Sequence, residues 1–243
     1  MNTEPPKEPS AVIRVKDLYK IYRVGETKVR ALNGVSFEIP KGEFVAIVGT
    51  SGSGKSTLLN MLAGLEKPTK GEILIGNVHI EKLTEKQLVA FRREKVGFIF
   101  QSYNLLNTMN AIENVALPLA FRGVPKKERL KKAREYMELV GVDKQEKHMP
   151  NQMSGGQQQR VGIARALVVK PQIIFADEPT GNLDPKTSEE IMKLLEEINE
   201  RGTTVLVVTH NREIVNAMKK RVITMNKGVI VNDEKEGTYI DEI

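Results

Sequence analysis

Apolar positions near the start of the chain alternate with polar ones. Val35, Phe37 and Ile39 are separated by single polar residues, and another apolar cluster lies at 12–15. An apolar residue at every second position is typical of a strand with one buried face. The beginning of the chain is therefore predicted to be rich in β-structure.

Further along, the apolar positions form short continuous runs at 44–48, 173–176, 205–208 and 222–225. Runs of this length are typical of strands buried on both faces of a sheet. Weaker strand-like segments lie at 73–75 and 96–100. No run approaches the roughly 18 residues that a membrane-spanning helix needs, so the sequence predicts no membrane span.

Two stretches carry apolar residues at the spacing of a helix. The first lies in a charged background and indicates an inserted helical part between about 102 and 165. The second precedes the strand at 205–208, and Asp184 can cap it with Pro185 at its first position. The apolar positions are Leu130, Ala133, Met137 and Val140 in the first stretch and Ile191, Leu194, Leu195 and Ile198 in the second.

Buried strands that alternate with helices predict an α/β fold with a mostly parallel sheet. The strands at the front add an N-terminal antiparallel β-subdomain, and the stretch at about 102–165 adds an inserted helical subdomain. A chain of 243 residues is long enough for one such domain, which we expect to occupy residues 11–243. Residues 1–10 carry prolines among polar side chains and are expected to form a flexible tail.

Composition narrows the function only a little. The net charge of +6 allows nucleic acid, anionic lipid or nucleotide phosphate as a partner, and the charge balance alone does not choose among them. With no cysteine, a disulfide framework and a thiolate metal site are both excluded. The function has to be argued from motifs.

A glycine-rich segment after the strand at 44–48 fits the pattern G-x-x-x-x-G-K-[ST] in full and opens a helix predicted at 56–63. Its glycines let successive backbone N–H groups surround phosphates, the lysine reaches the β- and γ-phosphates, and the last hydroxyl can ligate Mg²⁺. The motif makes the predicted sheet a P-loop NTPase core. The predicted phosphate-binding residues are Gly49, Thr50, Ser51, Gly52, Ser53, Gly54, Lys55, Ser56 and Thr57.

Two carboxylates, Asp177 and Glu178, directly follow the run at 173–176. This places them at the carboxyl edge of the sheet, where α/β proteins bind ligands. Taken alone, such a pair is more often a helix cap or a surface pair. Beside a phosphate loop, Asp177 is suited to hold Mg²⁺ and Glu178 to polarise the water that attacks the γ-phosphate.

A polar segment with two glycines, Ser154, Gly155, Gly156 and Gln157, lies just ahead of apolar positions at helical spacing. It is therefore predicted to form the N-terminus of a helix, where backbone N–H groups favour an anion. On the residues alone, a helix cap is the simpler interpretation, and a second ligand surface is the alternative.

The phosphate loop, the segment at 154–157 and the strand that ends in Asp177 and Glu178 occur in an order that resembles the nucleotide-binding domain of ABC transporters. The resemblance covers residues 12–231. It implies an ATPase that uses ATP and Mg²⁺, in which a second copy of the chain pairs head to tail. The 154–157 segment of one copy would then close over the ATP of the other. Met153 stands where the family usually has leucine, and we expect little effect from this change between apolar residues.

The resemblance also implies roles for single residues. Gln101 would contact Mg²⁺ and the attacking water while connecting to the helical part. His210 would contact the γ-phosphate, although a histidine at a strand end is more often structural when considered alone. Tyr22 matches the aromatic residue that stacks on adenine, and Tyr19 is the alternative for that role. Asp184 would help to join the two subunits, which is compatible with its role as a helix cap.

Within the family, the segments at 100–106 and 113–119 are similar to the MacB and LolD type, and those at 210–215 and 233–239 to the FtsE type. This resemblance implies integral membrane permease subunits of the FtsX, MacB or LolCE type as partners. The stretch at 102–121 would contact them, while its apolar residues can equally pack internally. A cytoplasmic location at the inner face of the cell membrane follows, with work in export, extraction of lipoproteins or peptides, or envelope remodelling.

Other functions are left open by the residues. A soluble ATP-dependent clamp without a permease would act on a protein or nucleic-acid machine, and the basic charge gives it weak support; we expect no nucleic-acid partner. A pure nucleotide-binding regulator is disfavoured by the intact Glu178. The basic run at 126–134 is either a solvated helix face or a contact for anionic lipid headgroups.

Overall fold

The computed structural model describes residues 11–238, and the tail predicted at 1–10 lies outside these described residues. The strands form a four-stranded and a six-stranded sheet. The four-stranded sheet is antiparallel and contains, in spatial order, β2 (Thr27–Pro40), β1 (Ala11–Val24), β4 (Lys70–Ile75) and β5 (Val78–His79). Its long first pair follows from the alternating pattern at the start of the chain.

The six-stranded sheet forms the centre of the molecule. Its spatial order is β10 (Val229–Glu234), β9 (Arg221–Asn226), β3 (Phe44–Val48), β8 (Thr204–Val208), β7 (Ile173–Asp177) and β6 (Val96–Ile99). All neighbours in it are parallel except β10 and β9. Every residue of β3 and β8 is buried, as the continuous apolar runs predict. The predicted α/β fold class is confirmed.

Helices connect strands within the central sheet and between the two sheets. The connecting helices are α1 (Lys55–Leu62), α2 (Glu85–Lys95), α6 (Pro185–Glu200) and α7 (Arg212–Met218), with short 3₁₀ turns η1 (Ile80–Lys82), η2 (Asp143–Gln145) and η3 (Pro150–Gln152) elsewhere. Asp184 caps α6 with Pro185 at its first position, as predicted. The apolar periodicity does not predict α2 or α7, because each buries only two apolar side chains.

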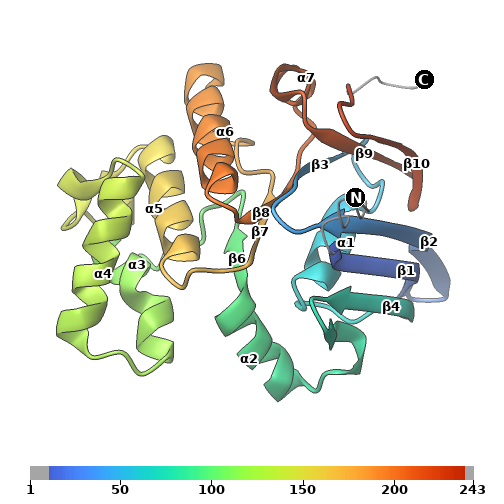
Figure 1. The fold of residues 1–243 in the computed structure, drawn as a ribbon, viewed down its shortest axis with the longest axis horizontal. Coiled ribbons are helices and arrows are strands. Elements are labelled where there is room, and N and C mark those ends of the chain that lie inside the picture. The colour runs from blue at the N-terminus through green and yellow to red at the C-terminus, as the bar shows by residue number, and fades with distance from the viewer. Residues whose placement is uncertain (1–10, 239–243) are drawn as a thin grey trace, which may run out of the picture.

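A helical part is inserted between β6 and β7. It consists of α3 (Ala111–Phe121), α4 (Lys126–Leu139) and α5 (Gly155–Leu167), which pack around fully buried side chains including Val115, Met137 and Val161. Figure 1 shows these helices at one end of the molecule and β1, β2 and β4 at the other. The six-stranded sheet lies between them.

Parallel pairing brings four strand ends to one edge. Ile47 of β3 pairs with Val208 of β8, and Ala176 of β7 pairs with Val207 of β8 and with Ile99 of β6. The segments that follow these strands therefore emerge side by side. They contain the phosphate loop, Gln101, the two carboxylates after β7 and His210.

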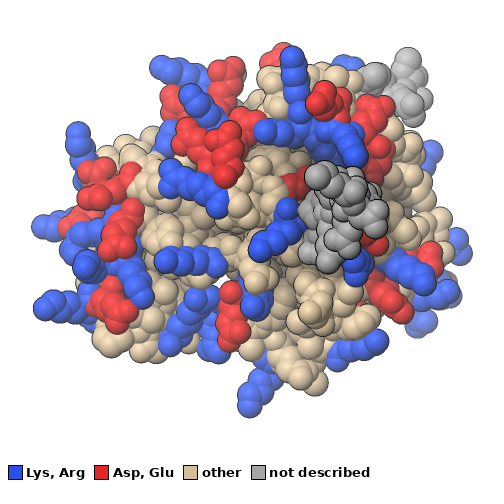
Figure 2. Space-filling model, viewed as in Figure 1, with Lys and Arg blue, Asp and Glu red and all other residues tan. Residues whose placement is uncertain are grey.

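No helix within residues 11–238 has both the length and the apolar character needed to cross a bilayer. Figure 2 shows Lys and Arg intermixed with Asp and Glu over the face in view. On this face the positive net charge is distributed rather than gathered into one basic surface.

Candidate nucleotide-binding site

The phosphate loop adopts a backbone that requires glycine at two of its positions. Gly49 and Gly54 have φ of +146° and +101°, values that other residues rarely adopt. A Cβ at Gly49 would lie 2.2 Å from the carbonyl oxygen of Met225, and one at Gly54 would lie 2.4 Å from that of Ala31. The loop therefore fits closely between β9 and β2, and α1 begins directly after it at Lys55.

Lys55 is 7% exposed and is held by the loop from which it starts. Its Nζ donates to the carbonyl oxygens of Gly49 and Thr50 at 2.8 and 2.9 Å. Burial lowers the pKa of this ammonium group, and the nearby Glu178 and Asp177 oppose that shift. The positive charge is thus stabilised by carboxylates and carbonyls at the place where the motif predicts phosphates.

Asp177 ends β7 beside the first turn of α1. The Ser56 hydroxyl donates to its Oδ1 at 3.1 Å, across 121 residues of sequence. Burial raises the pKa of Asp177, the hydrogen bond from Ser56 lowers it, and the charge of Glu178 adds to the rise. A cation beside a carboxylate in this setting would stabilise its ionised form.

Glu178 follows in a strained backbone conformation, with φ of +46°. Its backbone N–H donates to Val208 at 2.8 Å, and its Oε1 lies 2.8 Å from Nδ1 of His210. The carboxylate is 14% exposed, whereas the His210 side chain is 66% exposed. The histidine therefore covers a largely buried carboxylate from the solvent side.

Gln101 lies across the same cavity after β6. A Cβ at Gly181 would lie 2.7 Å from its Nε2, and Asn182 Nδ2 donates to its backbone carbonyl at 3.1 Å. The cavity has a volume of about 530 Å³. It is lined by Val29, Arg30, Ala31, Ser51, Gly52, Gly54, Lys55, Ser56, Thr57, Gln101, Glu178 and His210.

Tyr22 lies near this cavity but does not line it. It pairs across the sheet with Val29, which does line it, and its hydroxyl donates to Glu66 at 2.7 Å. Burial raises the pKa of Tyr22, and the bond to Glu66 adds to the rise. Tyr19, the alternative for stacking on adenine, packs against Gly34 instead. A Cβ at Gly34 would lie 3.0 Å from the Tyr19 hydroxyl.

The 154–157 segment begins α5 and lies outside this cavity. Ser154 caps the helix: its hydroxyl accepts from the N–H of Gln157 at 3.3 Å, and its own N–H donates to the Gln157 side chain at 2.9 Å. The helix-cap interpretation is therefore correct for the single chain. Close neighbours leave no room for a side chain at either glycine. A Cβ at Gly155 would lie 2.7 Å from the Tyr103 hydroxyl, and a Cβ at Gly156 would lie 2.6 Å from Thr187 Cγ2.

These motifs and their arrangement agree with the comparisons to known proteins. The sequence model of the ABC transporter family matches residues 32–181. The chain belongs to the ABC transporter family. It is 51% identical over 226 residues to an uncharacterized ABC transporter ATP-binding protein of Thermotoga maritima, with 93% of this chain and 96% of that protein covered. It is 50% identical over 228 residues to the cell division ATP-binding protein FtsE of Bacillus subtilis, with 94% and 98% covered.

One further relative is longer than this chain, and another has a solved structure. The macrolide export ATP-binding/permease protein MacB of Chlorobaculum tepidum is 46% identical over 228 residues, which cover 93% of this chain and 34% of that protein. The chain thus spans about a third of MacB. The dimeric structure of the cassette MJ0796 in a post-hydrolysis state, bound to ADP and Pi, has a TM-score of 0.86 and 44% identity, with 93% of this chain and 100% of that chain covered.

As an ABC transporter ATPase domain, the chain has a donor set that fits a Mg²⁺ ion accompanying ATP. Ser56, Asp177 and Gln101 supply oxygen atoms, which Mg²⁺ prefers, and the 3.1 Å bond between Ser56 and Asp177 brings two of them together. Within residues 11–238, no group of three or more His, Cys, Asp or Glu side chains is arranged to hold a metal. A Mg²⁺ ion at this place would be held by few protein ligands, as is usual where a nucleotide supplies further oxygen atoms.

The structure adds residues around the ABC ATPase site that sequence motifs do not reveal. Asn182 and Gly181 contact Gln101, Thr187 contacts Gly156, and Arg30 lines the nucleotide cavity. Gly181 and Asn182 lie three and two positions before Asp184 in the sequence. Neither residue type indicates that Gln101 is a neighbour. Only the pairing of β6 with β7 brings them together.

Proposed function

We propose that this ABC ATPase binds two ATP molecules between two copies of itself and uses their hydrolysis to drive an integral membrane permease of the FtsX, MacB or LolCE type. The binding of ATP between two copies is supported by one observation: the 154–157 segment does not line the nucleotide cavity of its own chain. Its helix N-terminus favours an anion, so a second copy is the natural source of the phosphates that it meets. The dimer of the similar cassette MJ0796 supports this arrangement.

ATP is held chiefly by the phosphate loop. The backbone N–H groups of residues 49–57 surround the phosphates, and Lys55 exchanges its bonds to Gly49 and Thr50 for the β- and γ-phosphates. Tyr22 stacks on the adenine beside Val29. Ser154, Gly155, Gly156 and Gln157 of the other copy close over the γ-phosphate, and Asp184 joins the two copies near the same place.

Hydrolysis requires a water aligned with the γ-phosphorus and a group that accepts its proton. Ser56, Asp177 and Gln101 would hold Mg²⁺, which neutralises the charge that develops on the phosphates. Glu178 accepts a proton from the water as its oxygen bonds to phosphorus and the bond to the β-phosphate breaks, giving ADP and phosphate. His210 orients Glu178 through the 2.8 Å contact and, as a residue that lines the cavity, would also bond the γ-phosphate.

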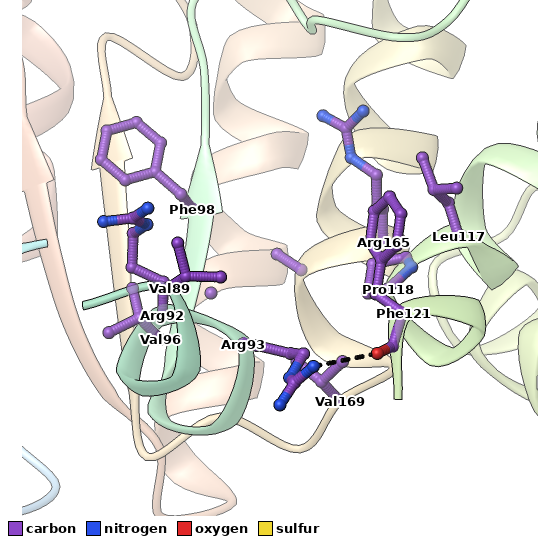
Figure 3. Close-up of a pocket in the computed structure, with 12 residues that line it drawn as sticks. Val89, Arg92, Arg93, Val96, Phe98, Leu117, Pro118, Phe121, Arg165 and Val169 are labelled. Atoms are coloured by element: carbon purple, nitrogen blue, oxygen red, sulfur yellow. Dashed lines mark hydrogen bonds between the residues drawn. The ribbon is translucent and has the colours of Figure 1, made fainter. Parts of the chain in front are cut away.

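A permease partner is supported by the comparisons and by a second cavity. The relatives include a cell division ATP-binding protein and a protein that combines ATP-binding and permease functions in one chain. A groove of about 580 Å³ lies between α2 and β6 on one side and α3 and α5 on the other (Figure 3). Part of the stretch expected to contact a permease, namely Leu117, Pro118 and Phe121, lines it.

The groove combines an apolar lining with arginines. Phe121 and Val89 are 66% and 52% exposed, which is unusual for large apolar side chains. Arg92, Arg93 and Arg165 line the same groove, and each donates to a backbone carbonyl. Among the described residues, no carboxylate forms an ion pair with any of the three. The groove therefore suits a permease segment that carries an apolar residue and carboxylates.

This partner would place the ATPase on the cytoplasmic face of the membrane, where ATP is available. The function is tested first on the chain alone. Size-exclusion chromatography of Glu178→Gln is expected to show a dimer with ATP and a monomer without it, while the unmodified chain hydrolyses ATP and Glu178→Gln does not. A Glu178→Gln variant that turns over ATP at the normal rate would contradict the role of Glu178.

The permease is tested by co-expression. Membrane sedimentation of the chain is expected only when a permease of this type is present, and Phe121→Asp is expected to abolish it. Val231→Asp is the matched control, because Val231 is also an exposed apolar residue, at 47%, but does not line the groove. Failure of the chain to sediment with membranes even when the permease is present would favour the alternative of a soluble clamp, whereas sedimentation without the permease would indicate direct contact with lipid.

A further inference from the structure

The loop that leads from Gln101 to α3 contains an unfavourable backbone stretch. Tyr103 and Asn104 have φ of +59° and +49°, in the left-handed region that residues other than glycine rarely adopt. Two such residues in succession persist only where their surroundings fix them. The side chains that fix this loop are therefore part of how Gln101 is placed.

One of these side chains comes from α5. Arg165 Nη2 donates to the carbonyl oxygen of Tyr103 at 2.7 Å, and Nη1 donates to that of Asn104 at 2.6 Å. The rigid fork of a guanidinium suits two adjacent carbonyls, which a lysine ammonium does not match. Burial lowers the pKa of Arg165, in keeping with a guanidinium held mostly inside the protein.

The side chain of Tyr103 runs along the same helix toward its first turn. A Cβ at Gly162 would lie 3.8 Å from the Tyr103 carbonyl oxygen, and one at Gly155 would lie 2.7 Å from the Tyr103 hydroxyl. The two glycines are about two turns apart on α5. Tyr103 therefore spans from the end of the helix that carries Arg165 to the 154–157 segment.

Arg165 also faces the groove proposed for the permease. Figure 3 shows it rising from α5 beside Leu117 and Pro118, opposite Phe98 and Val89. One side chain thus contacts both the groove and the loop that begins at Gln101. Gln101 in turn lines the nucleotide cavity.

We propose that Arg165 is a positioning residue for ATP hydrolysis. By holding the carbonyls of Tyr103 and Asn104 against α5, it fixes Gln101 at the nucleotide and keeps Tyr103 packed on Gly155. A permease segment in the groove contacts the same guanidinium, so docking acts on Gln101 through Arg165. This last step rests on the proposed permease function, whereas the positioning role belongs to the free chain.

The experiment compares Arg165→Met with Arg122→Met in the free chain. Arg122 is a matched control, since it also donates to two backbone carbonyls, those of Arg93 and Val169, but does not touch the loop. Arg165→Met is expected to lower kcat about tenfold, because a small displacement of a group that orients the reactants has such an effect. Its Kd for a fluorescent ATP analogue is expected to stay within about twofold, since the phosphate loop is unchanged. Arg122→Met is expected to keep both values.

Hydrogen exchange gives a readout that does not depend on activity. The amides of residues 101–106 are expected to exchange faster in Arg165→Met than in the unmodified chain, and not faster in Arg122→Met. Arg165→Lys, which preserves the charge and favours folding, is expected to give an intermediate kcat and intermediate exchange.

The proposal is overturned if Arg165→Met and Arg165→Lys keep the normal kcat and exchange, or if Arg122→Met lowers kcat equally. The same holds if Arg165→Met weakens nucleotide binding as much as it slows turnover. An unmodified chain without ATPase activity would instead contradict the proposed function, and the exchange comparison would still decide the role of Arg165 in holding the loop.

Discussion

Nδ1 of His210 lies 2.8 Å from Oε1 of Glu178, and the backbone N–H of His210 reaches the other carboxylate oxygen at 3.4 Å. One residue thus contacts both oxygens of the proposed general base. Because the ring is exposed while the carboxylate is not, the histidine can be changed without opening the core. His210→Ala therefore separates the orientation of Glu178 from the stability of the fold.

We expect His210→Ala to lower kcat about 100-fold, a loss typical of a misplaced general base. ATP binding should persist, because Lys55 and the phosphate loop are untouched. Steady-state ATPase assays and equilibrium binding of a fluorescent nucleotide measure the two effects. Equal losses of binding and turnover would place His210 in nucleotide binding alone.

Gly156 and Thr187 make a second testable pair. Gly156→Ala should lower the free energy of unfolding by about 1–3 kcal/mol, since its Cβ would lie 2.6 Å from Thr187 Cγ2. Thr187→Ser removes that methyl group and keeps the hydroxyl that donates to Asp184 at 2.6 Å. The double variant should recover most of the loss in chemical denaturation, and a double variant as unstable as Gly156→Ala would show that the clash lies elsewhere.

Asp184 predicts a pH dependence of stability. Its carboxylate accepts hydrogen bonds from the side chain and the backbone N–H of Thr187, and these hold the pKa of Asp184 below its ordinary value. The ionised cap therefore stabilises the fold above about pH 4, the usual range of an unfolded aspartate, and this contribution is lost as the pH falls through the lowered pKa.

Asp184→Asn keeps a helix cap that does not titrate. The difference in melting temperature between the unmodified chain and Asp184→Asn is expected to be constant from pH 6 to 8 and to shift in favour of the variant below about pH 4. A difference that stays constant throughout the acid range would rule out this contribution from Asp184.

Arg221 ties the strand pair at the end of the chain to the rest of the sheet. It donates to both oxygens of Asp233 at 2.7 and 2.8 Å and to Glu43 at 2.8 Å, and its side chain is 13% exposed. The two carboxylates raise its pKa, so the charge is fixed. We expect Arg221→Lys to lower the free energy of unfolding by about 2 kcal/mol, because an ammonium cannot bond both partners in this fork geometry. Urea denaturation measures it, with Arg14→Lys as a control at a pair that is at least half exposed.

The sequence predicts those features that depend on neighbouring residues. The buried strands, the cap at Asp184 and the phosphate loop each follow from a local pattern of residue types, and the structure contains them. The roles of the single site residues stay predictions, although the structure brings Lys55, Gln101, Glu178 and His210 to one cavity.

Features that depend on residues far apart in the sequence could not be predicted from local patterns. Arg165 and Tyr103 are 62 residues apart, and neither belongs to a motif that indicates the other. The spacing of apolar residues does not predict the helix α2, because only Leu88 and Phe91 are buried among its charged residues. The left-handed backbone of Glu178 has no sequence signal either, since glycine would be the usual residue at such φ.

The insertion of the helical part between two neighbouring strands has a mechanical consequence. The chain leaves the central sheet after Ile99 of β6 and returns at Ile173 of β7, and these strands are paired at the edge of the sheet. The two covalent crossings therefore lie at opposite ends of one parallel strand pair, and α5 also packs against β6 and α6 in a hydrophobic core that continues into the central sheet. A force applied at the groove is therefore transmitted to the sheet through this shared core as well as through the two crossings.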